Sequence, residues 1–413
     1  MKRLFTLATI FVTAGWGIYL LAGAVLAKWL AERLSGLVLK LGEGKISSPT
    51  EFIQHRMLEA AWLVSLLLLW AFAHGIVAKS RFKWPSSPRW SWVRHSLLAL
   101  ICLNVWLWQA DRTVLFWGLM WDDKQTQNLA RFRIKLILTQ EDRSPRRAIL
   151  MGSSQSRAQI DEELLNSLLG TKLRTTEMHY PGSKAYDHFL LQPVLEPARA
   201  DYIIVYLSEA DFHSGSTSEA VPNFFTFGGL PDLVRRGGTK YVPAGEVGYG
   251  LLGQMLPMFR MRDVLAQRLL GPAIGQMKQQ RYNSALESNL TERATSLAKT
   301  YESNEESRFQ KRALEDFLTR CRDSNQRVTL LAGQLNPLMG HQIDLEIRRE
   351  MLEQLRALAA KFPNLTVIEK LPEQTEQDYL DLTHVSKPAQ ERFTRFLAGW
   401  LDEHLPAVGE SSR

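Results

Sequence analysis

The sequence predicts an α/β domain that is built on a parallel sheet and preceded by three transmembrane helices. Charge is distributed unevenly over the 413 residues: residues 1–110 hold 12 Lys/Arg against 4 Asp/Glu, whereas residues 111–413 hold 38 against 39. From Arg146 onwards, short β-rich runs alternate with helical runs, which is typical of βα units around a parallel sheet. The expected parts are a membrane anchor (1–121), a linker (122–145), an α/β domain (146–405) and a tail (406–413).

Three apolar segments, at about 4–27, 60–78 and 96–110, are predicted to span the membrane. The first carries no charge from Leu4 to Ala27, which is long enough to cross about 30 Å of hydrocarbon. Eleven of the 12 tryptophans lie before residue 122, and tryptophan is enriched at membrane interfaces. The basic start and Ala22-Gly23-Ala24 also fit a cleavable signal sequence, so retention and cleavage of the first segment both stay open.

The loop between the second and third segments predicts the orientation. Its five charged residues are all cations: Lys79, Arg81, Lys83, Arg89 and Arg94. Cytoplasmic loops of membrane proteins carry an excess of Lys and Arg. We therefore expect a bacterial cytoplasmic (inner) membrane protein, with the bilayer as a partner, its N-terminus in the cytoplasm and the α/β domain outside. The charge-balanced remainder carries no basic stripe, so nucleic-acid binding is not expected.

The predicted strands are short runs rich in β-branched and apolar residues: Ala148–Met151, Thr175–His179, Tyr202–Leu207, Val328–Ala332 and Leu365–Glu369. The third and fourth are almost continuously apolar, as expected for strands that helices cover on both faces. The predicted helices are Gln155–Leu169, Ser307–Cys321, Ile347–Lys361 and Pro388–Glu403. Their alternation with the strands predicts a three-layer, doubly wound parallel sheet.

The stretch 213–304 breaks this rhythm and is expected to be a helical insertion. Its 232–281 portion holds eight cations against three acids. This portion could cap the site, or face lipid headgroups or an anionic polymer. A helical insertion with solvated charges is the alternative, and the sequence leaves the choice open.

Two motifs about 230 positions apart carry candidate chemistry. Gly152-Ser153-Ser154 places a serine at the turn between the first strand and the helix after it, where parallel sheets form their clefts. Asp381-Leu382-Thr383-His384 places a carboxylate three residues before a histidine. A serine hydroxyl needs a base to act as a nucleophile, and Ser154, His384 and Asp381 can supply nucleophile, base and orienting acid. Ser156 stands where the G-x-S-x-G elbow has its second glycine, so the α/β-hydrolase pattern does not apply.

These motifs and their order resemble the SGNH (GDSL-like) hydrolase superfamily, whose fold is flavodoxin-like. In that family a Gly-Asp-Ser block follows the first strand, a Gly the second, and a Gly-x-Asn-Asp block the third. Asp-x-x-His precedes the last helix. The resemblance covers roughly residues 145–403 without the insertion. It implies that Ser154 is the nucleophile, Asp381 the acid and His384 the base.

The resemblance also implies an oxyanion hole. Gly182, in Tyr180-Pro181-Gly182-Ser183, falls at the second-block glycine, whose N–H would hold the oxyanion with that of Ser154. The third block departs from the family, because Ser208-Glu209-Ala210-Asp211 has Ala210 where the oxyanion Asn should stand. Loss of one such donor typically costs roughly 2.7–4 kcal/mol of transition-state stabilisation. The side chains that could replace it are Gln155, Ser208 and Asn336.

Within the superfamily, the chain looks most like the membrane-anchored subset that includes the teichoic acid D-alanyl-transfer and alginate O-acetylation proteins. This resemblance implies an extracytoplasmic serine acyltransferase that O-acylates a cell-surface polysaccharide or glycopolymer. A multispanning membrane protein would then supply the acyl donor as a partner.

Two alternatives stay open. One is a carbohydrate or lipid esterase that uses the same triad with water as the acceptor. The other is a non-catalytic SGNH-like subunit of a cell-envelope polymer assembly or modification complex, which Ala210 favours. No cofactor is expected. No metal is expected either, because the nine histidines are scattered without ligand spacing.

Overall fold

The computed structural model describes residues 100–120, 127–142, 144, 146–213, 220–261, 294–295, 305–340 and 345–404. The expected membrane segments 4–27 and 60–78 and the expected tail 406–413 lie outside these residues. Residues 100–110, from the third expected segment, are helical. Among the described residues, no helix combines the length and apolarity needed to cross a membrane.

The chain folds into two compact units, Met1–Ile137 with Met255–Arg268 and Leu138–Gln254 with Leu269–Arg413. The described part of the first unit contains α5 (Val114–Leu119), most of α6 (Gln127–Glu141) and α14 (Pro257–Arg260). The Asp111 carboxylate pairs with the guanidinium groups of Arg133 of α6 and Arg260 of α14 and so links these two helices. The expected linker 122–145 therefore contains a helix, α6.

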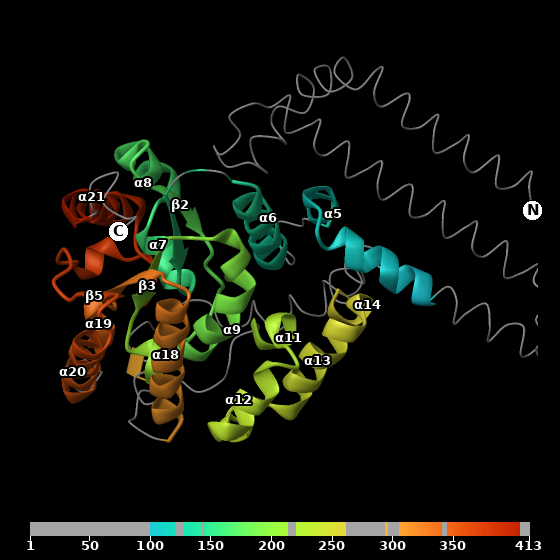
Figure 1. Cartoon of the computed structure of the whole chain (residues 1–413). Helices are drawn as coiled ribbons and strands as arrows, with labels where there is room; N and C mark the ends of the chain where they lie inside the picture. The colour runs from blue at the N-terminus through green and yellow to red at the C-terminus, as the bar shows by residue number, and fades with distance from the viewer. Residues whose placement is uncertain are drawn as a thin grey trace, which may run out of the picture. The chain divides into compact units, whose positions relative to one another are not determined.

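The second unit is built on five parallel strands, which cross the sheet in the order β2-β1-β3-β4-β5 (Figure 1). This is a common order of doubly wound sheets. Every strand ends within two residues of its predicted bounds, so the predicted α/β class with a parallel sheet is confirmed. The strands are β1 (Arg147–Met151), β2 (Arg174–Glu177), β3 (Tyr202–Leu207), β4 (Arg327–Ala332) and β5 (Leu365–Ile368).

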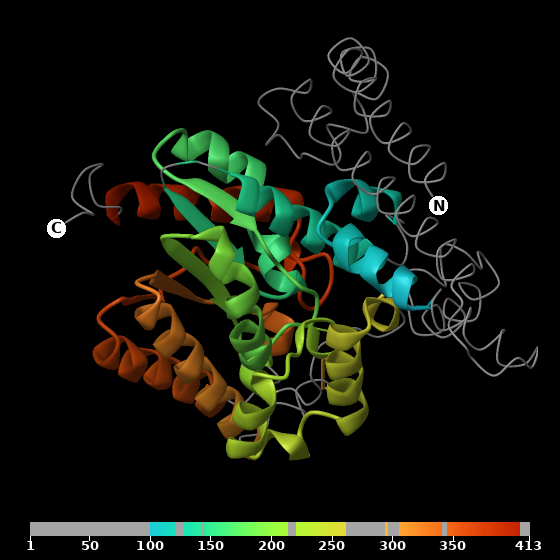
Figure 2. The same cartoon turned by 45° about the vertical axis from the view of Figure 1, so that its right-hand side comes forward.

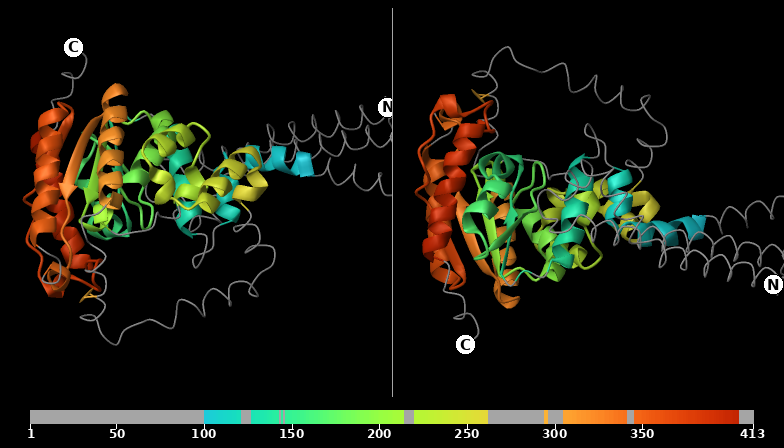
Figure 3. Two further views of the ribbon diagram at one scale, coloured as in Figure 1. Left: turned by 90° about the horizontal axis from the view of Figure 1, so that it is seen from below. Right: turned by 90° about the horizontal axis from the view of Figure 1, so that it is seen from above.

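Helices cover both faces of the sheet. On one face, α8 (Glu162–Leu169) lies beside α21 (Lys387–His404), as the upper layer of Figure 2 and the view from above in Figure 3 show. Leu165 of α8 and Phe393 of α21 share an apolar core with Ile204 of β3. The other face carries α9 (Ala185–Leu195), α18 (Glu305–Asp323) and α20 (Leu345–Lys361).

The predicted helix Gln155–Leu169 is wrong as a single element, because two helices replace it. α7 (Ser154–Gln159) ends before Ile160, whose backbone is extended at φ −117° and ψ 123°. Asp161 then accepts the N–H of Leu164 at 3.0 Å and caps the start of α8. Asp is a preferred N-cap residue, so the break has a local signal that the apolar period concealed.

The described part of the expected insertion 213–304 is mainly helical, as predicted. Its helices within the second unit are α11 (Ala220–Phe224), α12 (Gly229–Arg235), η2 (Gly238–Lys240) and α13 (Ala244–Met255). The remaining short helices of this unit are η1 (Glu196–Ala198), α10 (Ala210–His213), α19 (Pro337–Gly340) and η4 (Glu376–Asp378).

Gly152 connects β1 to α7 and offers a direct test of this packing. Its φ is +148°, and a Cβ at this position would lie 2.4 Å from Cβ of Ser156. We expect Gly152→Ala to lower the free energy of unfolding by about 1–3 kcal/mol, because α7 must move away from the strand. Denaturant unfolding of the full-length chain measures this loss.

Gly399→Ala is the matched control. Gly399 is exposed on α21, and an added Cβ there meets nothing within 4 Å. The alanine should keep or raise the stability by up to about 1 kcal/mol, because alanine is the better helix former. Equal effects of the two substitutions would contradict the close approach of α7 to β1.

Candidate active site

The carboxyl ends of the strands carry the residues that the sequence predicts for the site. In a doubly wound sheet of this order, ligand crevices form outside these ends, at the switch point between β1 and β3. The positions are Ser154 after β1, Gly182 after β2, Ser208 after β3, Asn336 after β4, and Asp381 and His384 between β5 and α21.

Ser154 is the first residue of α7. The positive φ of Gly152 reverses the chain after β1, and Oγ of Ser153 accepts the N–H of Gln155 at 3.3 Å as the helix cap. Ser153 and Gln155 are buried, whereas Ser154 is half-buried. Unpaired N–H groups give a helix start a partial positive charge. Ser154 is therefore only partly buried and lies at a helix start, where developing negative charge is favoured.

Asp381 and His384 form the hydrogen-bonded pair that their spacing predicts. Nδ1 of His384 lies 2.7 Å from Oδ2 of Asp381, so the ring donates to the carboxylate. The other oxygen, Oδ1, accepts the backbone N–H groups of Thr383 at 2.7 Å and His384 at 2.8 Å. Desolvation raises the pKa of Asp381, but the hydrogen bonds from His384 and Thr383 outweigh it and leave this pKa below its ordinary value. The carboxylate therefore stays ionised and holds the imidazole in one tautomer.

Backbone contacts close the segment around this pair into a tight loop. Tyr379 and Val385 form an antiparallel bridge, and the N–H of Leu380 donates to the carbonyl of His384 at 2.7 Å. The side chain of Leu382 is buried beneath the loop. Nδ2 of Asn336 donates to the carbonyl of Asp381 at 3.0 Å. The loop is thus fixed to the end of β4.

The same segment is also attached to the helix that begins with Ser154. The side-chain amides of Gln374 and Gln159 exchange hydrogen bonds at 2.8 and 3.0 Å, and Gln159 is the last residue of α7. Within the described residues, no hydrogen bond joins the Ser154 hydroxyl to the His384 ring. Catalytic hydrogen bonds often tighten only when substrate binds. The two halves of the expected triad therefore share one sheet edge and one hydrogen-bonded connection.

Gly182 lies beside the Ser154 turn. The carbonyl of Gly152 accepts the N–H of Tyr180 at 3.0 Å and the hydroxyl of Ser183 at 2.8 Å. These bonds fix the segment after β2 against the turn after β1. Gly182 itself is exposed, with φ +67°. The bonds of its neighbours Tyr180 and Ser183 thus hold Gly182 close to the turn that precedes Ser154.

The three side chains considered as replacement donors differ in their surroundings. Ser208 is fully buried, and its hydroxyl donates to Asp211 at 3.1 Å. Asn336 donates to Asp381 and accepts the N–H of Leu338 at 2.9 Å, so both ends of its amide are engaged. Gln155 is buried, and its acceptor oxygen Oε1 has no hydrogen-bond partner within the described residues. Of the three side chains, Gln155 is thus the one whose amide is not fully engaged within the fold.

Ala210, which stands where the resemblance would place an asparagine, packs against an apolar cluster. The cluster is formed by Ala294, Met339 and Leu382. An amide at position 210 would face these apolar side chains and would lose hydrogen bonds to water. The methyl group of Ala210 therefore supports the loop of Asp381 and His384 instead of supplying a donor.

A second line of serine, histidine and carboxylate lies beneath the site, and it was not predicted from the sequence. Oγ of Ser156 is hydrogen-bonded to Nε2 of His179 at 2.9 Å. Nδ1 of His179 lies 3.3 Å from Oε1 of Glu177, within ion-pair distance but outside hydrogen-bond geometry. Ser156 is fully buried, so its hydroxyl cannot meet a substrate. The line connects α7 to the end of β2. Glu177 and His179 are two residues apart, a spacing that places both side chains on one face of an extended chain, and this spacing was the signal in the sequence.

Asp211 is a buried carboxyl group next to the third block. Its Oδ2 accepts the N–H of Ser208 at 2.6 Å. Desolvation raises the pKa of Asp211 to about 7, although the bonds from Ser208 and the charge of Lys184 oppose the rise. With this pKa, the Asp211 carboxyl group is expected to lose its proton near neutral pH while the chain is folded.

No protein-family model matches the chain, and comparison with curated proteins finds no similar sequence. Within the described residues, no group of three His, Cys, Asp or Glu side chains could hold a metal ion.

Asp211 predicts a pH dependence of stability. An aspartate ordinarily titrates near pH 3.9, so between about pH 4 and pH 7 the unfolded chain has lost a proton that folded Asp211 keeps. Stability therefore falls as pH rises through this window and levels off above it. Asp211→Asn removes the titration and keeps an acceptor for Ser208. The stability of this variant minus that of wild type should therefore be larger at pH 8 than at pH 5. Thermal unfolding of both proteins at the two pH values measures this difference.

Asp402→Asn is the control, because Asp402 is an exposed carboxylate on α21 that pairs with Lys172. Surface pairs contribute little to stability, so its difference from wild type should stay flat between pH 5 and pH 8. A flat difference for Asp211→Asn as well would show that Asp211 does not titrate in this range.

Proposed function

We propose that the chain is an extracytoplasmic SGNH-like serine acyltransferase that O-acylates a cell-surface polysaccharide or glycopolymer. The Asp381–His384 pair carries the proposal, because it is hydrogen-bonded at 2.7 Å in a loop fixed to α7 and to the end of β4. Ser154 begins α7 at the same sheet edge. The strand order and the order of the motifs support an SGNH-like fold.

The first step of the proposed reaction forms an acyl-serine. His384 removes the proton of the Ser154 hydroxyl, and Oγ forms a bond to the acyl carbonyl carbon of the donor. Asp381 holds the Nδ1 proton and stabilises the imidazolium. The tetrahedral intermediate then collapses, the bond to the donor's leaving group breaks, and His384 returns the proton to that group.

Oxyanion stabilisation comes from the segments after β1 and β2. The proposal assigns the oxyanion to the N–H groups of Ser154 and Gly182, and the bonds of the Gly152 carbonyl to Tyr180 and Ser183 support it by holding these segments together. Gln155 is the third donor, because Ser208 and Asn336 are engaged elsewhere. Fixed donors of this kind usually contribute the largest share of transition-state stabilisation.

The second step transfers the acyl group to the polymer. A sugar hydroxyl gives its proton to His384 and attacks the acyl-serine, which releases Ser154 and leaves an ester on the sugar. The basic, Trp-rich N-terminal part of the sequence supports a location of this step outside the cytoplasmic membrane. A multispanning membrane partner delivers the acyl donor.

A non-catalytic polymer-binding subunit is the second candidate. The observation that favours it is Ala210, which leaves the third block without the donor found in the family. An apolar cluster fills that place. The two candidates differ in whether Ser154 is a reactive nucleophile.

Labelling of the full-length chain in membranes with a fluorophosphonate tests the nucleophile. Ser154→Ala and His384→Ala should abolish labelling, because the first removes the reacting oxygen and the second the base. Asp381→Asn should slow labelling by roughly 10⁴-fold, as in other triads with the wrong imidazole tautomer. In-gel fluorescence over time measures these rates.

Ser167→Ala is the matched control, because Ser167 is an exposed serine on α8. This variant should label at the wild-type rate. Equal labelling of wild type and Ser154→Ala would contradict the assignment of the nucleophile. Absence of labelling in every variant would favour the non-catalytic subunit.

Mass spectrometry of the surface polymer separates transfer from hydrolysis. Cells that contain the wild-type chain should carry more O-acyl groups than cells with Ser154→Ala, because a transferase adds esters. The reverse difference would identify an esterase with the same triad. Identical polymers would reject both reactions.

A further inference from the structure

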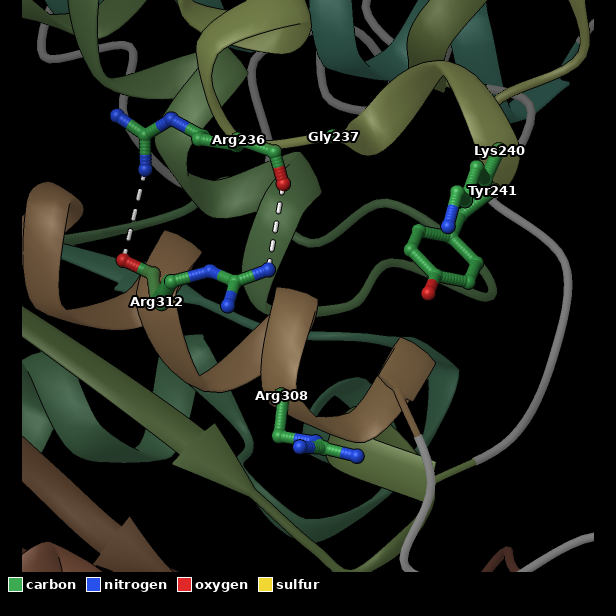
Figure 4. Close-up of a pocket in the computed structure, with 6 residues that line it drawn as sticks. All are labelled: Arg236, Gly237, Lys240, Tyr241, Arg308 and Arg312. Atoms are coloured by element: carbon green, nitrogen blue, oxygen red, sulfur yellow. Dashed lines mark hydrogen bonds between the residues drawn. The ribbon is translucent and has the colours of Figure 1, made fainter.

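A basic pocket lies between α18 and the segment that follows α12 (Figure 4). Its volume is about 180 Å³. Arg308 and Arg312 of α18 form one wall, and the chain from Arg236 to Tyr241 forms the other. The lining residues are Arg236, Gly237, Lys240, Tyr241, Arg308 and Arg312. Four of these six carry a positive charge, and none is acidic.

Hydrogen bonds fix the two walls to each other. Nη1 of Arg236 donates to the carbonyl of Arg312 at 3.5 Å, and Nη2 of Arg312 donates to the carbonyl of Arg236 at 3.2 Å (Figure 4). Arg236 also pairs with Asp316 and stacks over the ring of Phe189 at 4.3 Å. Arg236 is thus a buried, neutralised part of the wall.

Arg308 and Arg312 supply charge that the fold leaves uncompensated. Both are exposed on α18, and their spacing of four residues places them on one helix face. Within the described residues, Arg308 has neither an ion pair nor a hydrogen bond. Like charges at this spacing repel each other, so an anion between them would relieve the repulsion.

The shape and chemistry of the pocket favour a single anionic group on a sugar. Guanidinium groups bind phosphate and carboxylate oxygens in pairs, through planar forks of N–H donors. Tyr241 adds an aromatic wall, whose ring lies 5.5 Å from that of Phe309. Lipid surfaces instead attract clusters of basic residues through a diffuse field. A small pocket with two arginines on one wall fits a discrete group better.

The basic pocket is connected to the segment that carries the oxyanion glycine. Oε1 of Gln310, which lies between Arg308 and Arg312, accepts the N–H of Tyr186 at 2.9 Å. Phe309 contacts Tyr186 as well, at 4.9 Å between ring centroids. Tyr186 is in the first turn of α9, four residues after Gly182. A chain held in the pocket would therefore be held by the element next to the proposed site.

We infer that the basic pocket binds a phosphate- or carboxylate-bearing sugar residue of the acceptor glycopolymer. The assignment of this sugar to the acceptor rests on the proposed function, whereas its binding is independent of acyl transfer. The acceptor is then an anionic glycopolymer, which the chain holds at a charged residue while another hydroxyl is acylated.

Calorimetric titration of the purified full-length chain tests the binding. Glucose 1-phosphate and glucuronate are the anionic probes, and glucose is the neutral control. The anionic sugars should bind more tightly than glucose, and their affinity should fall as salt rises. Arg308→Ala should weaken their binding about tenfold, as expected for the loss of a charge-assisted hydrogen bond. Arg308→Lys should restore part of the affinity, because it keeps the charge without the fork.

Arg395→Ala, at an exposed arginine of α21, is the matched control and should bind as wild type does. Equal affinity for glucose and the anionic sugars, or full affinity in both Arg308→Ala and Arg312→Ala, would overturn the inference. Displacement of glucose 1-phosphate by a short-chain phosphatidylglycerol but not by glucuronate would assign the pocket to a lipid headgroup and overturn the sugar assignment.

Ser154→Ala separates this inference from the proposed function. The variant should bind the anionic sugars as wild type does, because the pocket contains no part of the triad. Binding without fluorophosphonate labelling of wild type would reject the acyltransferase and keep the pocket. Labelling of Ser154 without preferential binding of anionic sugars would reject the assignment of the basic pocket and keep that of Ser154 as the nucleophile.

Discussion

Helix α7 begins directly after β1 because position 152 has no side chain. A Cβ there would overlap Ser156, and the φ of +148° disfavours any residue with a Cβ. The turn leaves Ser154 half-buried at the helix start, and the Gly152 carbonyl anchors Tyr180 and Ser183 of the next block. The segments of the proposed nucleophile Ser154 and the proposed oxyanion donor Gly182 therefore share a single point of attachment.

The parallel sheet joins this turn to residues far along the chain. Each strand ends at the same edge, so the loop of Asp381 and His384 meets segments that precede it by more than 200 positions. Polar contacts through Asn336 and Gln374 hold the loop from two sides, and Leu382 holds it from below. Ala210 packs against that apolar support, so position 210 supplies no hydrogen-bond donor to the site.

Much of this architecture can be predicted from short stretches of the sequence. The strands are short apolar runs, and Asp381-x-x-His384 needs only one loop turn to form its pair, so both could be predicted. The break between α7 and α8 could not, because the apolar period runs through Ile160 and hides the cap at Asp161. The role of Asn336 and the bond between Ser156 and His179 depend on contacts between segments far apart in the sequence, which composition does not specify. The basic pocket likewise combines cations from α18 with others more than 60 positions earlier.

An experimental structure of the full-length chain after reaction with a fluorophosphonate tests the central claim most directly. The account predicts one phosphonyl adduct on Oγ of Ser154. Its P–O oxygen should lie within about 3 Å of the N–H nitrogens of Ser154 and Gly182, and Nε2 of His384 should lie within hydrogen-bond reach of Oγ. An adduct on another serine, or an adduct at Ser154 with His384 turned away from it, would contradict the account.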